Sequence, residues 1–266
     1  MTKLQVSETF RTIQGEGPHA GTPAIFLRLA GCNLQCGAVG RDLNDVDPIR
    51  DEPTEGASWV CDTIPVWKDT EFSVSATTLV DKFRSNGWLF DLRRGDHLVL
   101  TGGEPTLPAH QQAFTEFVDQ LHSLNPTLTP TVEVETNGTI VPNNEFADTV
   151  DLFNVSLKLS NSGHSRDRRL YSDAIEWHIE NHQSTSEPYS GSVFKFVAAN
   201  DSDIEEIKDL AKEFDIPNSM ITVMPAGQTR DQLRKTYPVV AELAKNQSWR
   251  FSPRLHVEIW NQQTGV

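Results

Sequence analysis

Apolar and polar positions alternate along the chain with two periods, one typical of buried strands and one of amphipathic helices. Short apolar runs indicate strands at Ala24–Ala30, His97–Thr101, Thr131–Thr136, Leu152–Leu157, Val193–Val197, Met220–Met224 and Leu255–Trp260. Helical patterns cover residues 75–84, 108–124, 168–181, 201–214 and 229–245. Strands that alternate with helices predict an α/β fold of parallel βα units, arranged as an open or closed barrel.

Polar and glycine-rich stretches recur where the predicted strands end. The first two cysteines follow the first strand, Thr101–Pro105 ends the second, and Glu135–Gly138 ends the third. Ser156 and Lys158 lie at the end of the fourth strand. Parallel barrels carry their chemistry at the carboxyl ends of their strands, so this recurrence predicts one composite pocket.

The three cysteines are candidate metal ligands. Cys32 and Cys36 form a CxxxC pair, and Cys61 follows after residues 37–60, a 24-residue stretch with six acidic residues and no regular period. We interpret this stretch as an inserted acidic loop. Lengthening the gap from two residues to 24 costs about 2 kcal/mol of closure entropy, which metal–thiolate ligation worth on the order of 10 kcal/mol readily offsets. An iron–sulfur cluster, a zinc site with a histidine ligand, and ordinary buried thiols all remain open at this point.

Composition narrows the classes of function. The chain has 266 residues, which suits one domain over residues 1–266, and 37 acidic residues against 23 Lys plus Arg give a net charge of −14. Such a surface repels nucleic-acid phosphates and anionic membranes, so neither is an expected partner. The sequence shows no signal-peptide core and no membrane-length apolar run, which predicts a cytoplasmic protein. In that reducing compartment an odd number of cysteines favours metal binding or catalysis over disulfides.

Two further features point to ligand binding. Arg28 interrupts an apolar strand and needs a partner, either a protein carboxylate or the carboxylate of a ligand. In Thr101-Gly-Gly-Glu-Pro105 the two glycines expose backbone groups to a close ligand, and the proline fixes the turn. A Gly-Gly turn alone is commonplace, but here it occurs together with the CxxxC pair.

Together these motifs resemble the radical S-adenosylmethionine (SAM) superfamily and, within it, the 7-carboxy-7-deazaguanine synthase family. The resemblance to that family runs in order along nearly the whole chain, through Gln14–Gly17, Gly21–Ala24, Arg28–Leu34, Cys61–Thr63, Thr101–Pro105, Glu135–Gly138, Ser156–Lys158 and Ser252–His256. The sequence departs from the usual pattern in two ways. The gap between the second and third cysteines is 24 residues long, and Ser156-Leu157-Lys158 replaces the more frequent Ser-Pro-Lys.

The resemblance implies a partial, open parallel βα barrel and a specific reaction. Three cysteines would hold a [4Fe–4S] cluster whose fourth iron binds SAM. The radical formed from SAM would take a hydrogen atom from 6-carboxy-5,6,7,8-tetrahydropterin. The pterin ring would then contract, with loss of ammonia, to 7-carboxy-7-deazaguanine. An electron donor such as flavodoxin or ferredoxin and a homodimer are also implied.

The resemblance also assigns a role to individual residues. Cys32, Cys36 and Cys61 would ligate the cluster, Thr63 a Mg²⁺ ion, and Asp62, Gly102, Gly103, Glu104, Ser156 and Lys158 would contact SAM. Ile13, Gln14, Gly15, Glu16, Arg28, Thr101 and His256 would bind the pterin, with Arg28 on its carboxylate. No catalytic side chain is expected beyond the cluster and the SAM radical. Another radical SAM enzyme, such as a glycyl-radical activase, and a non-enzymatic zinc protein are the alternatives.

Overall fold

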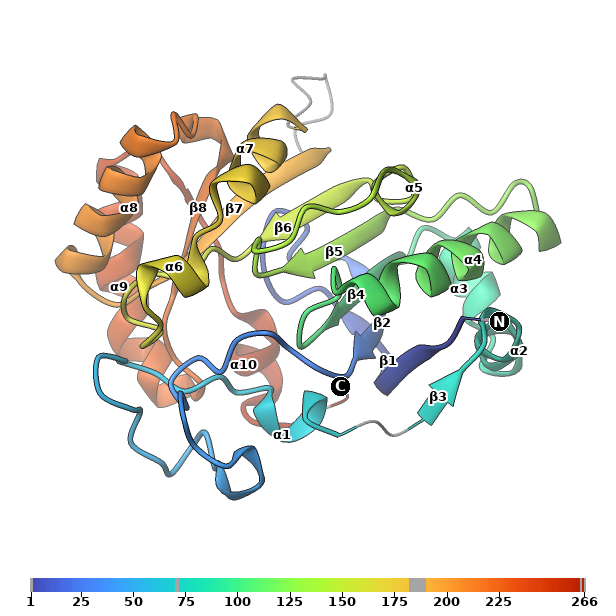
Figure 1. The fold of residues 1–266 in the computed structure, drawn as a ribbon, viewed down its shortest axis with the longest axis horizontal. Helices are drawn as coiled ribbons and strands as arrows, with labels where there is room; N and C mark the ends of the chain where they lie inside the picture. The colour runs from blue at the N-terminus through green and yellow to red at the C-terminus, as the bar shows by residue number, and fades with distance from the viewer. Residues whose placement is uncertain (1, 70–71, 182–189, 264, 266) are drawn as a thin grey trace.

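The computed structural model describes residues 2–69, 72–181, 190–263 and 265 of the chain. Its centre is a curved nine-stranded sheet with the strand order β3-β1-β2-β4-β5-β6-β7-β8-β9 (Figure 1). The strands are β1 (Leu4–Ile13), β2 (Pro23–Leu29), β3 (Phe72–Val74), β4 (His97–Gly102), β5 (Val132–Thr136), β6 (Leu152–Val155), β7 (Gly191–Ala198), β8 (Ile221–Pro225) and β9 (Arg250–Phe251).

The sheet is mostly parallel. From β2 through β9 every neighbouring pair is parallel, whereas β1 pairs antiparallel with β2 and β3. The edge strands β3 and β9 do not pair with each other in the described part of the chain, so the barrel is open. The predicted α/β class with a partial parallel βα barrel is confirmed.

Helices lie between and after the strands, most of them along the outer side of the sheet (Figure 1). They are α1 (Ile64–Trp67), α2 (Ala76–Ser85), α3 (Trp88–Arg93), α4 (Pro108–Leu124), α5 (Asn144–Ala147), α6 (Arg166–Arg169), α7 (Ser172–Glu180), α8 (Asp201–Glu213), α9 (Arg230–Asn246) and α10 (Leu255–Trp260), with 3₁₀ turns η1 (Leu43–Asp45) and η2 (Asn218–Met220). Among the described residues no helix is long and apolar enough to span a membrane.

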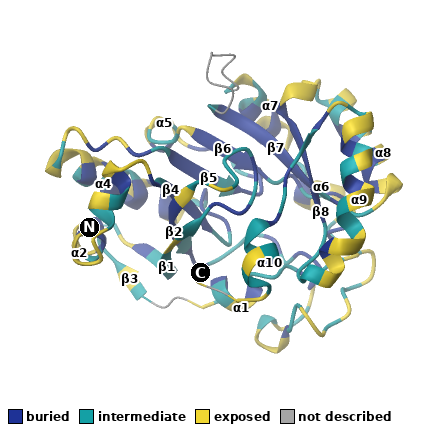
Figure 2. Cartoon of the chain, turned by 180° about the vertical axis from the view of Figure 1, so that it is seen from behind, coloured by how far each residue is buried: buried dark blue, intermediate teal, exposed yellow. Residues whose placement is uncertain are grey.

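Side-chain alternation along the strands separates an apolar layer from a polar one. Leu98 and Leu100 of β4 belong to the large core cluster with the helix residues Phe114 and Phe117, whereas Thr101 faces the opposite, concave side. Charged residues at alternate strand positions, such as Lys195 in β7, also face the concave side. Figure 2 shows the result: the central strands are mostly buried, and the outer faces of α8 and α9 are exposed.

The prediction of a strand over Leu255–Trp260 was wrong, because this segment forms helix α10. Its apolar alternation suggested a strand, yet Val257 is buried and Ile259 is 47% exposed. The sheet already ends at β9, and Pro253, two residues after it, cannot donate a ladder hydrogen bond.

Two other segments differ from the pattern-based expectation. The helix predicted over 168–181 is interrupted at Leu170 and Tyr171, which have extended backbone, and divides into α6 and α7. Strand β1 lies in an N-terminal segment for which no strand was predicted. Within residues 37–60 the structure has turns and the short 3₁₀ turn η1. That the chain forms a single domain stays a prediction.

We expect Phe117→Ala to lower the free energy of unfolding by about 3–5 kcal/mol, because it removes a large aromatic side chain from a close-packed core. Phe117 is 0% exposed, and its ring centroid lies 5.0 Å from that of Phe83. Phe90→Ala is the matched control, since Phe90 is 63% exposed; it should change stability by less than about 0.5 kcal/mol. Guanidinium unfolding followed by circular dichroism measures both, and equal effects would contradict the assignment of the core.

Candidate active site

The carboxyl ends of the strands open into a cavity of about 680 Å³ on the concave side of the sheet. Every candidate residue predicted from the sequence lines this cavity except Glu104, which is fully buried. Strands β1, β2, β4, β5, β7 and β8 contribute to the walls, together with the segment after β6 and the residues around α1 and α10. The sequence therefore predicted the members of one pocket, although their roles toward ligands stay predictions.

The three thiols gather at one side of the cavity and are not joined by a disulfide. Burial raises the pKa of Cys36 to about 12, and burial together with the charge of Glu104 and of the other two thiols raises the pKa of Cys32 further. Metal ions bound between three such neighbouring thiols would convert them to thiolates. The donor set fits a cluster held by three cysteines.

The long acidic stretch does not carry Cys61 away from the other cysteines, because its two ends meet. The amide of Cys61 donates to the carbonyl of Cys36 at 3.0 Å, and the amide of Thr54 donates to the carbonyl of Gly37 at 2.9 Å. Gly37 has φ +72°, and a Cβ there would lie 1.9 Å from the carbonyl oxygen of Trp59. Residues 37–60 thus form a loop whose two ends lie next to each other, beside the cysteines predicted to bind the cluster.

The Gly-Gly turn after β4 packs directly against the cysteine loop. A Cβ on Gly103 would lie 2.0 Å from the carbonyl oxygen of Gly31 and 2.9 Å from Cβ of Cys32. On Gly102, which has φ +145°, it would lie 2.3 Å from the carbonyl oxygen of Leu29. Because the obstructing atoms belong mostly to backbone, only glycine allows this approach. The turn thereby reaches the rim of the thiol site.

Glu104 connects the strand ends that surround this site. Its carboxylate accepts from the amide and hydroxyl of Thr106 at 2.9 and 2.6 Å, from the hydroxyl of Thr136 at 2.7 Å and from the amide of Asn137 at 2.7 Å. Its own amide donates to the carbonyl of Gly31 at 2.8 Å. Both carboxylate oxygens therefore accept hydrogen bonds from the protein. The predicted contact of Glu104 with SAM would then have to come from its backbone.

Two polar residues of the segment after β6 face the same cavity. The ammonium of Lys158 donates to the hydroxyl of Ser156 at 2.8 Å and lies 6.0 Å from the ring centroid of Trp59. Thr63 lies near the thiols as well, with its hydroxyl 3.2 Å from Sγ of Cys61. Hydroxyl and ammonium donors beside a thiol site suit a ligand that carries a carboxylate.

A buried ion-pair network forms the far wall. Glu16 pairs with Lys195 and with Arg254, whose guanidinium also binds Asp62 at 2.7 Å. Burial raises the pKa of Glu16, but the charges of Lys195 and Arg254 outweigh it and hold the pKa well below its usual range. His256 lies against Arg254, and burial with that neighbouring charge lowers its pKa to about 4. At neutral pH this wall therefore presents two carboxylates, two cations and a neutral imidazole.

Sequence reasoning missed Lys195, Arg254 and Glu135. Lys195 is the one charge in the apolar run Val193–Val197, the same signal that identified Arg28. Glu135 accepts from Gln14 at 3.2 Å and from Thr101 at 2.8 Å, which links three strand ends. A search for charged residues within otherwise apolar strands would have identified Lys195 and Glu135, but not Arg254.

Of the two partners predicted for Arg28, the structure shows the protein carboxylate, and the ligand carboxylate stays a prediction. Its Nε donates to Glu8 at 2.7 Å, so the salt bridge exists. The terminal nitrogens make no hydrogen bond to a described residue, and the side chain also lines the cavity. One part of the guanidinium is held by the protein, and the other is available to a ligand carboxylate.

Known proteins were compared with this chain. No family model matches it. The 7-carboxy-7-deazaguanine synthase of Halobacterium salinarum is 31% identical over 274 residues, covering 97% of this chain and 91% of that protein. The chain belongs to the 7-carboxy-7-deazaguanine synthase family. The synthase of Pyrobaculum aerophilum is 27% identical over 265 residues, covering 99% of this chain and 97% of that protein.

A solved structure agrees in fold. The crystal structure of QueE from Escherichia coli aligns with a TM-score of 0.58 and 22% identity over 94% of this chain and 93% of that chain. As a member of its family the chain is a radical SAM enzyme with a [4Fe–4S] cluster and SAM as cofactors. The zinc-protein alternative is not supported.

We expect Glu104→Ala to lower the free energy of unfolding by about 3 kcal/mol or more, because each buried donor left without an acceptor costs about 1–3 kcal/mol. Guanidinium unfolding under anaerobic conditions measures this. Glu205→Gln is the control, since Glu205 forms an exposed pair with Lys208 and such pairs contribute about 0–1 kcal/mol. An alanine variant as stable as the parent chain would show that Glu104 does not hold the strand ends together.

Proposed function

We propose that this enzyme converts 6-carboxy-5,6,7,8-tetrahydropterin into 7-carboxy-7-deazaguanine with loss of ammonia. The observation that carries the proposal is the convergence of three thiols, the Gly-Gly turn and a charged substrate wall on one cavity. Family membership points to the same activity, because the curated relatives are named 7-carboxy-7-deazaguanine synthase.

Cys32, Cys36 and Cys61 would hold the cluster, which together with SAM supplies a carbon-centred radical able to take a hydrogen atom from the substrate. The backbone at Gly102 and Gly103 would receive the amino group of SAM, since no side chain blocks its approach. Ser156 and Lys158 would bind the polar groups of SAM, Lys158 through charge-assisted hydrogen bonds. Asp62, which is held by Arg254, would also contact SAM.

The pterin would lie between the far wall and Arg28. Arg28 would bind its carboxylate with the nitrogens that Glu8 does not use. Gln14, Thr101 and Glu16 offer amide, hydroxyl and carboxylate groups to the ring, with Ile13 and Gly15 lining the same side. His256 is held at close range to Gly15, where a Cβ would lie 2.2 Å from Nδ1 of His256.

The remaining assignments of the family extend this proposal. The hydroxyl of Thr63 faces the cavity and would ligate a Mg²⁺ ion that bridges to substrate oxygens. An electron donor of the flavodoxin or ferredoxin type would reduce the cluster, and the chain would act as a homodimer. A cytoplasmic location agrees with three cysteines that form no disulfide.

Turnover tests the proposed function against the other radical SAM alternative. Enzyme reconstituted anaerobically, with SAM, Mg²⁺ and a reductant, should convert 6-carboxytetrahydropterin to a product whose mass reports the loss of ammonia. Cleavage of SAM without ring contraction would favour an enzyme such as a glycyl-radical activase. Mass spectrometry of substrate, product and 5′-deoxyadenosine distinguishes the two outcomes.

Arg28→Ala should raise the KM for the pterin by about 10- to 100-fold, since a charge-assisted contact contributes about 1.5–3 kcal/mol. Uncoupled SAM cleavage should persist, because the proposal assigns Arg28 to the pterin carboxylate and not to the cluster or SAM. Glu8→Gln is the matched control: it removes the protein partner of Arg28 and leaves the guanidinium in place. If Glu8→Gln and Arg28→Ala impair pterin binding equally, Arg28 has a structural role only.

A further inference from the structure

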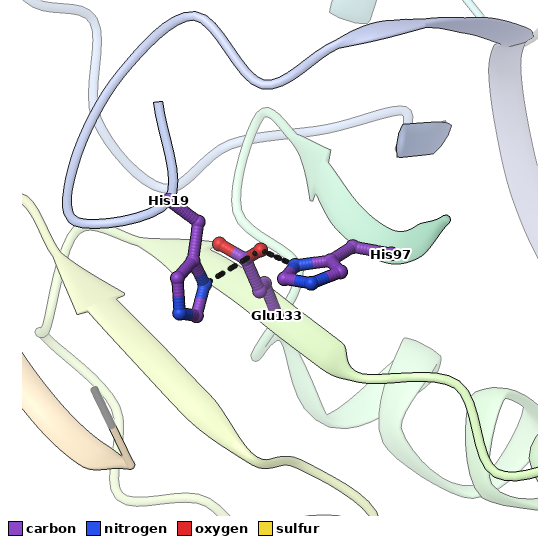
Figure 3. Close-up of side chains that lie close together, drawn as sticks. All are labelled: His19, His97 and Glu133. Carbon is purple, nitrogen blue, oxygen red and sulfur yellow. Dashed lines mark hydrogen bonds and ion pairs between the residues drawn. The ribbon is translucent and has the colours of Figure 1, made fainter. Parts of the chain in front are cut away.

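A second cluster of metal-ligand side chains lies away from the thiols. His19, His97 and Glu133 place one imidazole or carboxylate ligand atom each within 4.8 Å of the others (Figure 3). His97 is the first residue of β4 and Glu133 the second of β5, so the cluster sits near the amino ends of the strands. The cysteines follow the carboxyl ends, hence the two groups belong to different ends of the barrel.

The geometry of the three side chains is that of ligands aimed at one point. Nδ1 of His97 lies 2.5 Å and Nδ1 of His19 lies 3.0 Å from the same oxygen, Oε1 of Glu133. The two imidazole rings meet edge to face with their centroids 4.8 Å apart. Each residue comes from a different segment, the β1–β2 loop, β4 and β5, and Figure 3 shows the three converging.

We propose that His19, His97 and Glu133 bind a divalent transition-metal ion, of which Zn²⁺ fits the donor set best. Two imidazole nitrogens and a carboxylate oxygen are preferred zinc ligands, and imidazole suits zinc more than it suits Mg²⁺ or Ca²⁺. The proposed reaction assigns no role to these three residues, so the metal site can be tested independently of the proposed function.

Burial supports the site. The side chain of Glu133 is 0% exposed, and its second oxygen, Oε2, is buried without a hydrogen-bond partner among the described residues. The imidazoles are 16% and 15% exposed, which leaves an ion a path of entry.

Small movements would convert the hydrogen-bonded arrangement into a coordinated one. Zinc with ligands at about 2.0–2.2 Å places them about 3.3 Å apart in a tetrahedron. The two nitrogens lie 2.5 and 3.0 Å from Oε1, so these two nitrogen–oxygen distances need to lengthen by less than about 1 Å. A water molecule or Oε2 of Glu133 would complete the coordination.

The ion would fix the position of a loop that also serves the cavity. The β1–β2 connection carries Gln14 and Glu16 at its start and His19 three residues later. Strand β5 presents Glu133 to the cluster and Glu135 to Gln14. A bond from His19 to β4 and β5 through one ion therefore anchors the loop that lines the substrate side, which makes the site a structural one.

Zinc titration of the anaerobically reconstituted holoenzyme tests the proposal, because the cysteines are then occupied by the cluster. In competition with a chromophoric chelator the holoenzyme should bind one Zn²⁺ per chain. His97→Gln and His19→Gln should each weaken this binding by more than about 100-fold, since loss of an outer partner alone costs 10- to 100-fold. His122→Gln, at an exposed histidine of α4, should leave it unchanged.

The zinc K-edge X-ray absorption spectrum distinguishes this site from the cysteines. It should show nitrogen and oxygen neighbours at about 2.0–2.1 Å with imidazole outer shells. Sulfur neighbours at about 2.3 Å, no stoichiometric zinc in the holoenzyme, or equal zinc affinity in the His19→Gln variant would each overturn the proposal. His19 lies in a loop, so that variant retains the strand packing if His97→Gln fails to fold.

Discussion

The buried carboxylate of Glu104 is the contact on which the site depends. Its four accepted hydrogen bonds join the end of β4 to the end of β5, and its amide binds the cysteine loop through Gly31. Parallel strands ordinarily leave their carboxyl ends open, with backbone groups that need partners. Here one side chain satisfies several of them at once and brings the Gly-Gly turn against Cys32. A geometry that accepts a cluster and SAM together follows from this packing.

Charge is distributed around that core in a way that the net value of −14 conceals. The cations Lys158, Lys195, Arg28 and Arg254 line the cavity although the chain is acidic overall. Buried charges are tolerated only with partners, and Glu16 and Asp62 supply them for the far wall. We therefore expect these local cations, within an acidic surface, to recognise an anionic substrate such as the family's carboxylated pterin.

Periodicity and motifs predicted much of this architecture. The alternation of apolar strands and helices identified the open parallel βα barrel, and the residues at the strand ends converge as expected. Strand β1 and helix α10 were not predicted. The six-residue apolar alternation of Leu255–Trp260, for example, does not reveal whether a neighbouring strand is present. The positions of Lys195 and of the cluster of His19, His97 and Glu133 depend on which strands are neighbours and in what register they pair. A single sequence does not show this.

The central claim is that Cys32, Cys36 and Cys61 together hold one cluster, although 24 residues separate the last two. The meeting of the loop ends, through Cys61 and Cys36, is the structural basis of that claim. Iron and acid-labile sulfide, counted per chain after anaerobic reconstitution, test it most directly. The parent chain should hold one [4Fe–4S] cluster, and Cys61→Ala should hold none. A normal iron and sulfide content in Cys61→Ala would contradict the account.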